Sequence, residues 1–267
     1  MKKIYCLCLA CLLVSVVAAQ SVKELYIFHT NDMHSRIEPF ASYFPDTLLA
    51  GKAGVLRRAA FVKEQRREHK DMLLFDSGDF SQGSPYYNLF KGEVEIKMMN
   101  EMGYDAGTIG NHEFNYGLNY LNQITGSQFN VDGITASASA CKGPNFPLVL
   151  SNVISARNNQ PLFKPYKIIT KTFTATTPDG KTVTVPLKIG IIGFTTPGIM
   201  QWDKKWLDGK VTTAGAKEMA EKYVPQMKTE GADVIVALSH GGIDTSPYSP
   251  TMENASWHLS QVAGIDA

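Results

Sequence analysis

The sequence is poor in cysteine, has almost no net charge, and contains no apolar run long enough to span a bilayer. Its 267 residues include 26 basic and 25 acidic ones, a balance that gives no reason to expect a nucleic-acid polymer or an anionic membrane as partner. Three of the four cysteines lie within the first eleven residues, so a chain that lost this segment would keep only Cys141 and could form no internal disulfide. We therefore expect stability to come from a packed core, for which the 44% apolar content is sufficient.

The first nineteen residues are typical of an export signal. Two lysines precede an apolar stretch over residues 4–17, and small residues that suit a cleavage site follow it. This stretch is shorter than the roughly 20 residues that a membrane-spanning helix needs. We predict a signal peptide over residues 1–19, an exported and periplasmic protein, and no transmembrane segment after its removal. A lipid anchor on Cys11 is the alternative, because small residues also precede that cysteine.

Beyond the signal, apolar β-rich runs alternate with amphipathic helical patterns, which is typical of an α/β protein. The expected strands cover residues 25–28, 72–75, 106–109, 148–154 and 233–238. The expected helices cover residues 53–69, 93–102 and 213–228, the last of which Pro225 should bend or end. A hairpin is predicted around the turn at residues 178–181. No repeat or low-complexity linker interrupts the pattern, so we predict one domain over residues 20–267.

Four short polar motifs follow apolar runs. They are Asp32-Met33-His34, Gly78-Asp79, Gly110-Asn111-His112-Glu113 and Ser239-His240-Gly241. Side chains two residues apart in extended backbone point the same way, so Asp32 and His34 can face one ion. A carboxylate has two oxygens, so Asp79 can bridge two cations.

Together these motifs supply nitrogen and oxygen donors suited to Mn²⁺, Zn²⁺, Fe²⁺ or Co²⁺. Two such ions about 3.5–4 Å apart can activate a water molecule and assist displacement at phosphorus. We therefore predict a site for two divalent metal ions, with His112 pointing towards substrate. The predicted metal ligands are Asp32, His34, Asp79, Asn111 and His240.

Each motif taken alone also has an ordinary structural interpretation. Asp32 could cap a turn, and Asn111 could cap a helix that has Glu113 in its first turn. His240 could be a hydrogen-bonded core histidine. Their joint occurrence at strand ends, where ligands of α/β proteins bind, favours the metal site.

The order of the motifs resembles the calcineurin-like metallophosphoesterases over about residues 25–267. Residues 30–34 and 110–114 resemble the exported 5′-nucleotidase branch of that family. Shorter segments, among them residues 83–85, 115–117 and 200–203, resemble the 2′,3′-cyclic-nucleotide 2′-phosphodiesterase/3′-nucleotidase subgroup. In 5′-nucleotidases an Asp that pairs with the catalytic histidine typically occupies the position of Asn115. Because Asn115 carries no charge, it favours the cyclic and 3′-nucleotide subgroup, and any raised imidazole pKa must have another source.

The resemblance implies a four-layer α-β-β-α sandwich and a division of labour among the predicted residues. Asp32, His34 and Asp79 would hold one ion, and Asp79, Asn111 and His240 would hold the other. Asn111 and His112 would contact substrate. His112 would be catalytic, by stabilising the transferring phosphoryl group or protonating the leaving oxygen.

The family completes its metal site with a G-H-x-H motif that follows a G-I-D sequence, and here Gly264-Ile265-Asp266 is followed only by Ala267. We therefore expect the sandwich to be truncated before its last strands, without the family's second, nucleoside-binding domain. The expected function is nucleotide hydrolysis by metal-activated hydroxide, with 2′,3′-cyclic and 3′-nucleotides preferred. The alternatives are a 5′-nucleotidase/UDP-sugar hydrolase, a non-catalytic metal-binding fragment, and a solute-binding protein.

Overall fold

The structure is a computed structural model and describes residues 24–134 and 141–267. The predicted signal peptide, and with it the alternative anchor at Cys11, lies outside the described residues. Among the residues that are described, no helix combines the length and the apolar character needed to cross a membrane.

The first sheet is parallel and has three short strands in the order β1-β2-β3. These strands are β1 (Ile27–Thr30), β2 (Leu73–Asp76) and β3 (Ala106–Gly107). Strand β1 begins two residues later than the sequence predicts. Parallel neighbours need crossover connections, and helices supply them: α1 (Val55–Glu68) before β2, then α2 (Pro85–Phe90) and α3 (Glu93–Met102) before β3.

The second sheet is mixed and has the order β5-β6-β8. Strands β5 (Tyr166–Thr176) and β6 (Thr182–Thr195) form the predicted hairpin, and β8 (Val234–His240) pairs parallel with β6. The helix α7 (Ala216–Thr229) precedes β8 and continues past Pro225, so of the two predicted effects of this proline, a bend or an end, the end is wrong. Buried apolar side chains on both sides of the proline hold the helix against the sheet, and this packing outweighs the missing N–H.

The remaining elements are short. Strand β4 (Val153–Ser155) pairs antiparallel with β7 (Val211–Thr213). The predicted strand over residues 148–154 is wrong in its first half, because its backbone N–H groups bond in turn to Gly107, Lys164 and Gly193 rather than to one partner strand. The other short elements are η1 (His112–Phe114), α4 (Gly117–Ile124), α5 (Ile199–Trp202), α6 (Lys204–Leu207) and α8 (Ser256–Ser260).

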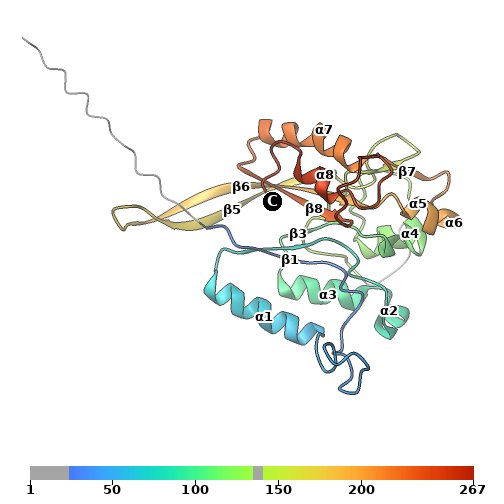
Figure 1. The fold of residues 1–267 in the computed structure, drawn as a ribbon, viewed down its shortest axis with the longest axis horizontal. Helices are drawn as coiled ribbons and strands as arrows, with labels where there is room; N and C mark the ends of the chain where they lie inside the picture. The colour runs from blue at the N-terminus through green and yellow to red at the C-terminus, as the bar shows by residue number, and fades with distance from the viewer. Residues whose placement is uncertain (1–23, 135–140) are drawn as a thin grey trace, which may run out of the picture.

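The two three-stranded sheets face one another between two helical layers (Figure 1). Helices α1 and α3 cover the outer face of the first sheet, and α7 and α8 cover the second. Between the sheets, one apolar cluster combines side chains of both, including Leu73, Phe75, Ile191, Val236 and Leu238. The predicted four-layer α-β-β-α architecture is therefore confirmed. Beyond this core, the hairpin of β5 and β6 projects as a long arm.

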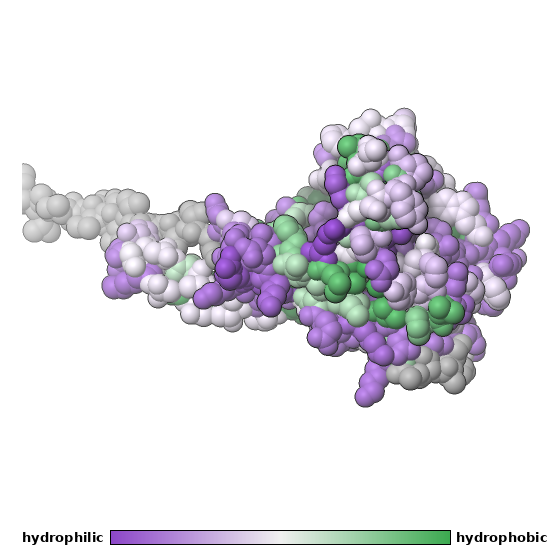
Figure 2. Space-filling view, turned by 90° about the horizontal axis from the view of Figure 1, so that it is seen from below, coloured by the Kyte–Doolittle hydropathy of each residue, from purple (hydrophilic) through white to green (hydrophobic). Residues whose placement is uncertain are grey.

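The outer face of the first sheet's helices is mixed in character. Figure 2 views the molecule from this side, and hydrophobic surface lies there between hydrophilic patches. A groove of about 420 Å³ between α1 and α3 is lined mainly by apolar side chains, among them Leu56, Val62 and Met98. The predicted metal ligands lie elsewhere, at the carboxyl ends of the strands.

Candidate metal centre

All five predicted ligands lie where β1, β2, β3 and β8 end. Asp32 and His34 follow β1, Asp79 follows β2, Asn111 follows β3, and His240 is the last residue of β8. Parallel strands present their carboxyl ends at one edge of a sheet, and facing sheets bring two such edges together. The fold therefore gathers donors that are up to 208 positions apart in the sequence, from Asp32 to His240.

The loop after β1 runs beside the loop after β2. The backbone N–H of Asp32 donates to the carbonyl of Gly78 at 3.0 Å, and that of His34 donates to the carbonyl of Asp79 at 3.0 Å. Asp32 and His34 have φ angles of 51° and 44°, so the predicted extended backbone is wrong here. The left-handed conformation of these two residues allows their backbone N–H groups to reach the carbonyls of the neighbouring loop. The two side chains still converge, with Asp32 Oδ1 3.4 Å from His34 Nε2.

Two glycines let the loops after β2 and β3 touch backbone to backbone. A β carbon on Gly78, whose φ is 94°, would collide with the backbone of Gly110. A β carbon on Gly110 would collide with the carboxylate of Asp79. Only glycine fits such an approach, and the approach fixes Asp79 close to Asn111 and His112.

The buried carboxylate of Glu113 links the loops after β2 and β3 by hydrogen bonds. It accepts the backbone N–H of Asp79 at 2.9 Å and that of Gly110 at 2.8 Å. It also accepts the backbone N–H of Ser81 at 3.1 Å and the Ser81 hydroxyl at 2.7 Å. The sequence predicts for Glu113 only a place in the first turn of a helix. Its position directly after Asn111-His112 is the one local sign of this anchoring role.

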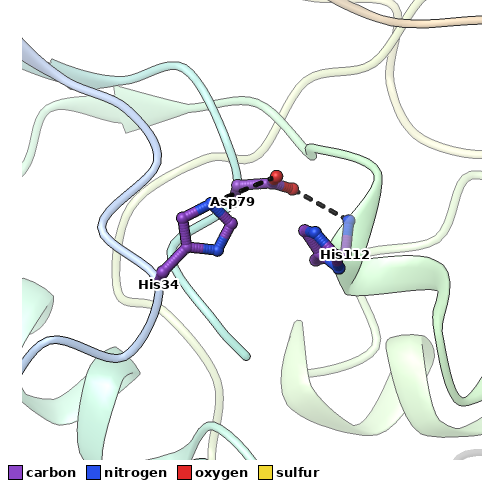
Figure 3. Close-up of side chains that lie close together, drawn as sticks. All are labelled: His34, Asp79 and His112. Carbon is purple, nitrogen blue, oxygen red and sulfur yellow. Dashed lines mark hydrogen bonds and ion pairs between the residues drawn. The ribbon is translucent and has the colours of Figure 1, made fainter. Parts of the chain in front are cut away.

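Asp79 is the common point of the site. Its Oδ2 lies 3.3 Å from His240 Nε2 and 3.8 Å from His34 Nε2. Its Oδ1 accepts the backbone N–H of His112 at 2.8 Å. Figure 3 shows the side chains of His34 and His112 on opposite sides of the Asp79 carboxylate. A carboxylate with donors on both sides has the placement that bridging two cations requires.

His240 is oriented by a backbone group. Its Nδ1 donates to the carbonyl of Ser77 at 2.9 Å, so its Nε2 points into the site, 3.0 Å from Asn111 Oδ1. Burial alone would lower the pKa of His240, but the hydrogen bond and charge of Asp79 raise it to about 9. Likewise, burial alone would raise the pKa of Asp79, but the hydrogen bond and charge of His240 lower it. His240 Nε2 thus lies close to two oxygen atoms, an arrangement that also suits the binding of a cation.

The donor atoms form two groups that share Asp79. In one, atoms of Asp32, Asp79 and His240 lie within 4.8 Å of one another; in the other, so do atoms of His34, Asp79 and His112. Nitrogen and oxygen donors at this spacing fit borderline divalent cations such as Zn²⁺ or Mn²⁺. His112 is therefore close enough to be a ligand by distance.

The side chain of His112 is held by two further residues. Its Nδ1 lies 2.7 Å from Asn115 Oδ1, and Asn115 Nδ2 lies 3.1 and 3.2 Å from the two carboxylate oxygens of Asp203. Asp203 is buried, with 4% of its surface exposed, at the junction of α5 and α6. No local sequence pattern indicates the contact of Asp203 with the site, and the sequence resemblance includes only the segment that contains it, residues 200–203.

A cavity of about 360 Å³ opens beside these donors. Asp32, Asn111, His240 and the half-exposed Trp202 line it, together with residues of the loop after β8. Its volume lies within the range of small-molecule sites. The site thus combines convergent metal donors with room for a ligand.

Comparison with known proteins identifies the family. Residues 25–263 match the calcineurin-like phosphoesterases, and the chain belongs to this family. It is 40% identical, over 97% of its length, to a 2′,3′-cyclic-nucleotide 2′-phosphodiesterase/3′-nucleotidase of Salmonella typhimurium. It is 32% identical, over 82% of its length, to a snake venom 5′-nucleotidase of Gloydius brevicauda.

The chain spans only part of these relatives: 38% of the Salmonella protein and 33% of the snake venom protein. Among solved structures, the calcineurin-like phosphoesterase YfkN of Bacillus subtilis is similar, with a TM-score of 0.72 and 35% identity. That match covers 91% of this chain and 70% of the other. The described fold is therefore that of the family.

Proposed function

We propose that this calcineurin-like phosphoesterase hydrolyses nucleotides with two divalent cations and prefers 2′,3′-cyclic and 3′-nucleotides. The observation that carries the proposal is the position of Asp79, whose carboxylate lies between donors from three other strand ends. The name of the Salmonella relative supports the substrate class.

The donors divide between two proposed cation positions. Asp32, His34 and Asp79 would hold one ion, and Asp79, Asn111 and His240 would hold the other. When bound, two such ions supply positive charge that lowers the pKa of a water molecule and stabilises negative charge on a phosphoryl group. The surrounding protein holds the donors in place through Glu113 and the contacts between the loops.

His112 would serve the leaving group. Its Nδ1 is engaged by Asn115, which leaves Nε2 to hydrogen-bond a phosphoryl oxygen or protonate the leaving oxygen. The attacking water loses one proton to solvent, its oxygen forms a bond to phosphorus, and the ester P–O bond breaks. The proton on Nε2 of the doubly protonated His112 goes to the ribose oxygen, and a proton from solvent restores His112. With a 2′,3′-cyclic substrate, opening at the 2′ oxygen leaves a 3′-nucleotide, which a second hydrolysis converts to nucleoside and phosphate.

The second candidate is 5′-nucleotide hydrolysis, which the likeness to the snake venom 5′-nucleotidase favours. Asn115 argues against it, because the 5′-nucleotidases typically carry Asp at this position. Assays of the full-length gene product with 2′,3′-cAMP, 3′-AMP and 5′-AMP separate the two. We expect kcat/KM for the first two substrates to exceed that for 5′-AMP at least about tenfold, a discrimination of roughly 1.4 kcal/mol. A preference for 5′-AMP would overturn the first choice.

The proposed location is the periplasm, reached by cleavage of the signal peptide after about residue 19. The basis is the sequence pattern of residues 1–19. Mass spectrometry of the protein from a periplasmic extract should give an N-terminus at residue 20 or 21. A lipid-modified N-terminus at Cys11 would favour the anchored alternative.

A further inference from the structure

A side chain that the proposed mechanism does not use stands behind His112. Asp203 Oδ1 and Oδ2 lie 3.1 and 3.2 Å from Asn115 Nδ2, and Asn115 Oδ1 lies 2.7 Å from His112 Nδ1. Asn115 and Asp203 are 88 positions apart, and the chain between them includes α4 and the strands β4, β5 and β6. Tertiary folding, rather than local sequence, therefore creates this chain of hydrogen bonds.

The hydrogen bonds have a fixed direction. An ionised carboxylate only accepts hydrogen bonds, so Asp203 requires that the amide nitrogen of Asn115 face it. The amide oxygen of Asn115 must then face His112, and an amide oxygen also only accepts. His112 consequently keeps a proton on Nδ1 in both of its charge states, and Nε2 is the nitrogen that binds the second proton and can deliver it to the leaving oxygen.

In the part of the chain that the structure describes, the Asp203 side chain makes no hydrogen bond that would stabilise a helix end or a loop. Although Asp203 is the N-cap residue of α6, its side chain makes no capping hydrogen bond there. Within residues 24–134 and 141–267, Asn115 is the only side-chain hydrogen-bond partner of this carboxylate. Burying a carboxylate is costly unless it is well partnered, and here its one partner leads directly to His112.

We propose that Asp203 is a positioning residue that acts through Asn115 to set the orientation and proton position of His112. The negative charge that 5′-nucleotidases typically place next to the histidine stands one side chain further away here. Asn115 transmits its effect by aligning two hydrogen bonds. This inference rests on the proposed role of His112 in phosphoester hydrolysis.

Asn115 and Asp203 should therefore behave as a matched pair. In Asn115→Asp, two carboxylates would face each other at about the present 3.1 Å separation, an arrangement in which like charges strongly disfavour joint ionisation. In Asp203→Asn, the charge is lost and the amide of Asn115 is no longer held in one orientation. The double exchange, Asn115→Asp with Asp203→Asn, restores one carboxylate and one amide behind His112.

The experiment compares these three variants of the full-length gene product with Asp208→Asn, the same chemical change at an exposed position six residues from α5. Steady-state kinetics with 2′,3′-cAMP, bound-metal content and melting temperature are measured for each. We expect Asp203→Asn to lower kcat about 10- to 100-fold, with KM changed less than about twofold and metal content unchanged. Asn115→Asp should lose at least as much, the double exchange should regain most of the loss, and Asp208→Asn should match the wild type.

Rescue of kcat by the double exchange is the deciding readout when the melting temperature does not follow it, because a merely structural role for Asp203 predicts that kcat and melting temperature change together. Unchanged kcat in Asp203→Asn would overturn the inference. So would a double variant no more active than the single ones. If Asp203→Asn fails to fold, the comparison of Asn115→Asp with the double exchange still decides. A wild-type protein that hydrolyses none of the nucleotides would instead overturn the proposed function.

Discussion

The site edge, formed by the loops after β1, β2, β3 and β8, and the hairpin tip, residues 176–186, are both rich in polar residues. They differ in burial. At the site edge and the strand end before it, Asp76, Asp79 and Glu113 are 0%, 2% and 0% exposed, whereas no residue of the hairpin tip is buried. A buried charge costs free energy unless it is partnered, while an exposed one is solvated by water. Three buried carboxylates at one edge therefore indicate a site, whereas the exposed charges of the hairpin tip are accounted for by solvation alone.

The largest expected difference between the two regions comes from the same substitution, Asp to Asn, made once in each. Asp79→Asn removes the charge shared by both proposed cation positions, so metal content and turnover should both fall, turnover by at least about a thousandfold. Asp179→Asn makes the same change at the hairpin tip and should alter neither. Metal analysis by mass spectrometry and nucleotide hydrolysis measure the two effects. A fully active Asp79→Asn enzyme would remove the basis for a bridging carboxylate.

Within the site edge, two of the three histidines near Asp79, His240 and His112, should respond differently to substitution. His240 is oriented by the carbonyl of Ser77 and faces Asn111 and Asp79, so His240→Ala should lose cation and turnover together. His112→Ala should keep its metal content and lose turnover about 10²–10⁴-fold, the usual contribution of a general acid. The exposed His29 supplies the control, His29→Ala, which should retain both. Loss of metal in His112→Ala would make this histidine a ligand, which its distance from Asp79 permits.

Much of this arrangement follows from local sequence. The helix α3 has the bounds that the sequence predicts, because apolar residues at helical spacing lie between Gly92 and Gly103, both left-handed. The five ligand candidates could be named because each follows a short apolar run. Parallel strands then bring such positions together whatever the details of the loops.

The rest depends on contacts between distant segments. The left-handed backbone of Asp32 and His34 is required by hydrogen bonds to the neighbouring loop, which no local pattern encodes. Glu113 and Asp203 act through partners up to 34 and 88 positions away. Helix α7 passes Pro225 because of packing against the second sheet. In each case tertiary structure outweighs local propensity.

Substitution of Glu113 tests whether its hydrogen bonds to the loops after β2 and β3 stabilise the folded protein. In Glu113→Gln, the amide nitrogen would meet an N–H or O–H donor in place of an acceptor, so at least one buried donor loses its partner. We expect the free energy of unfolding to fall by about 3 kcal/mol, with a smaller loss of metal affinity. Urea unfolding of the metal-free protein gives the first quantity, and titration with Zn²⁺ or Mn²⁺ gives the second. Glu101→Gln, an exposed change on α3, is the matched control; equal stability of the two variants would contradict the anchoring role.

The smallest effect concerns pH and again separates the two regions. Burial raises the pKa of Asp76 to about 7, although Thr30 and the backbone of Gly78 hydrogen-bond its carboxylate. The unfolded chain loses this proton near pH 4, so between about pH 4 and 7 the folded protein binds more protons, and stability must fall as pH rises. The difference in unfolding free energy between wild type and Asp76→Asn should therefore decrease by about 2 kcal/mol from pH 5 to pH 7, measured with a chelator present.

At the hairpin tip the pKa of the carboxylate is shifted in the opposite direction. The hydrogen bond from Lys181 holds the pKa of Asp179 below its ordinary value, so this carboxylate is ionised in both the folded and unfolded chain throughout pH 5–7. Asp179→Asn should consequently change stability equally at the two pH values. If Asp76→Asn showed the same lack of pH dependence, Asp76 would be ionised in the folded protein despite its burial. Burial would then not distinguish the titration of Asp76 at the site edge from that of the solvated Asp179 at the tip.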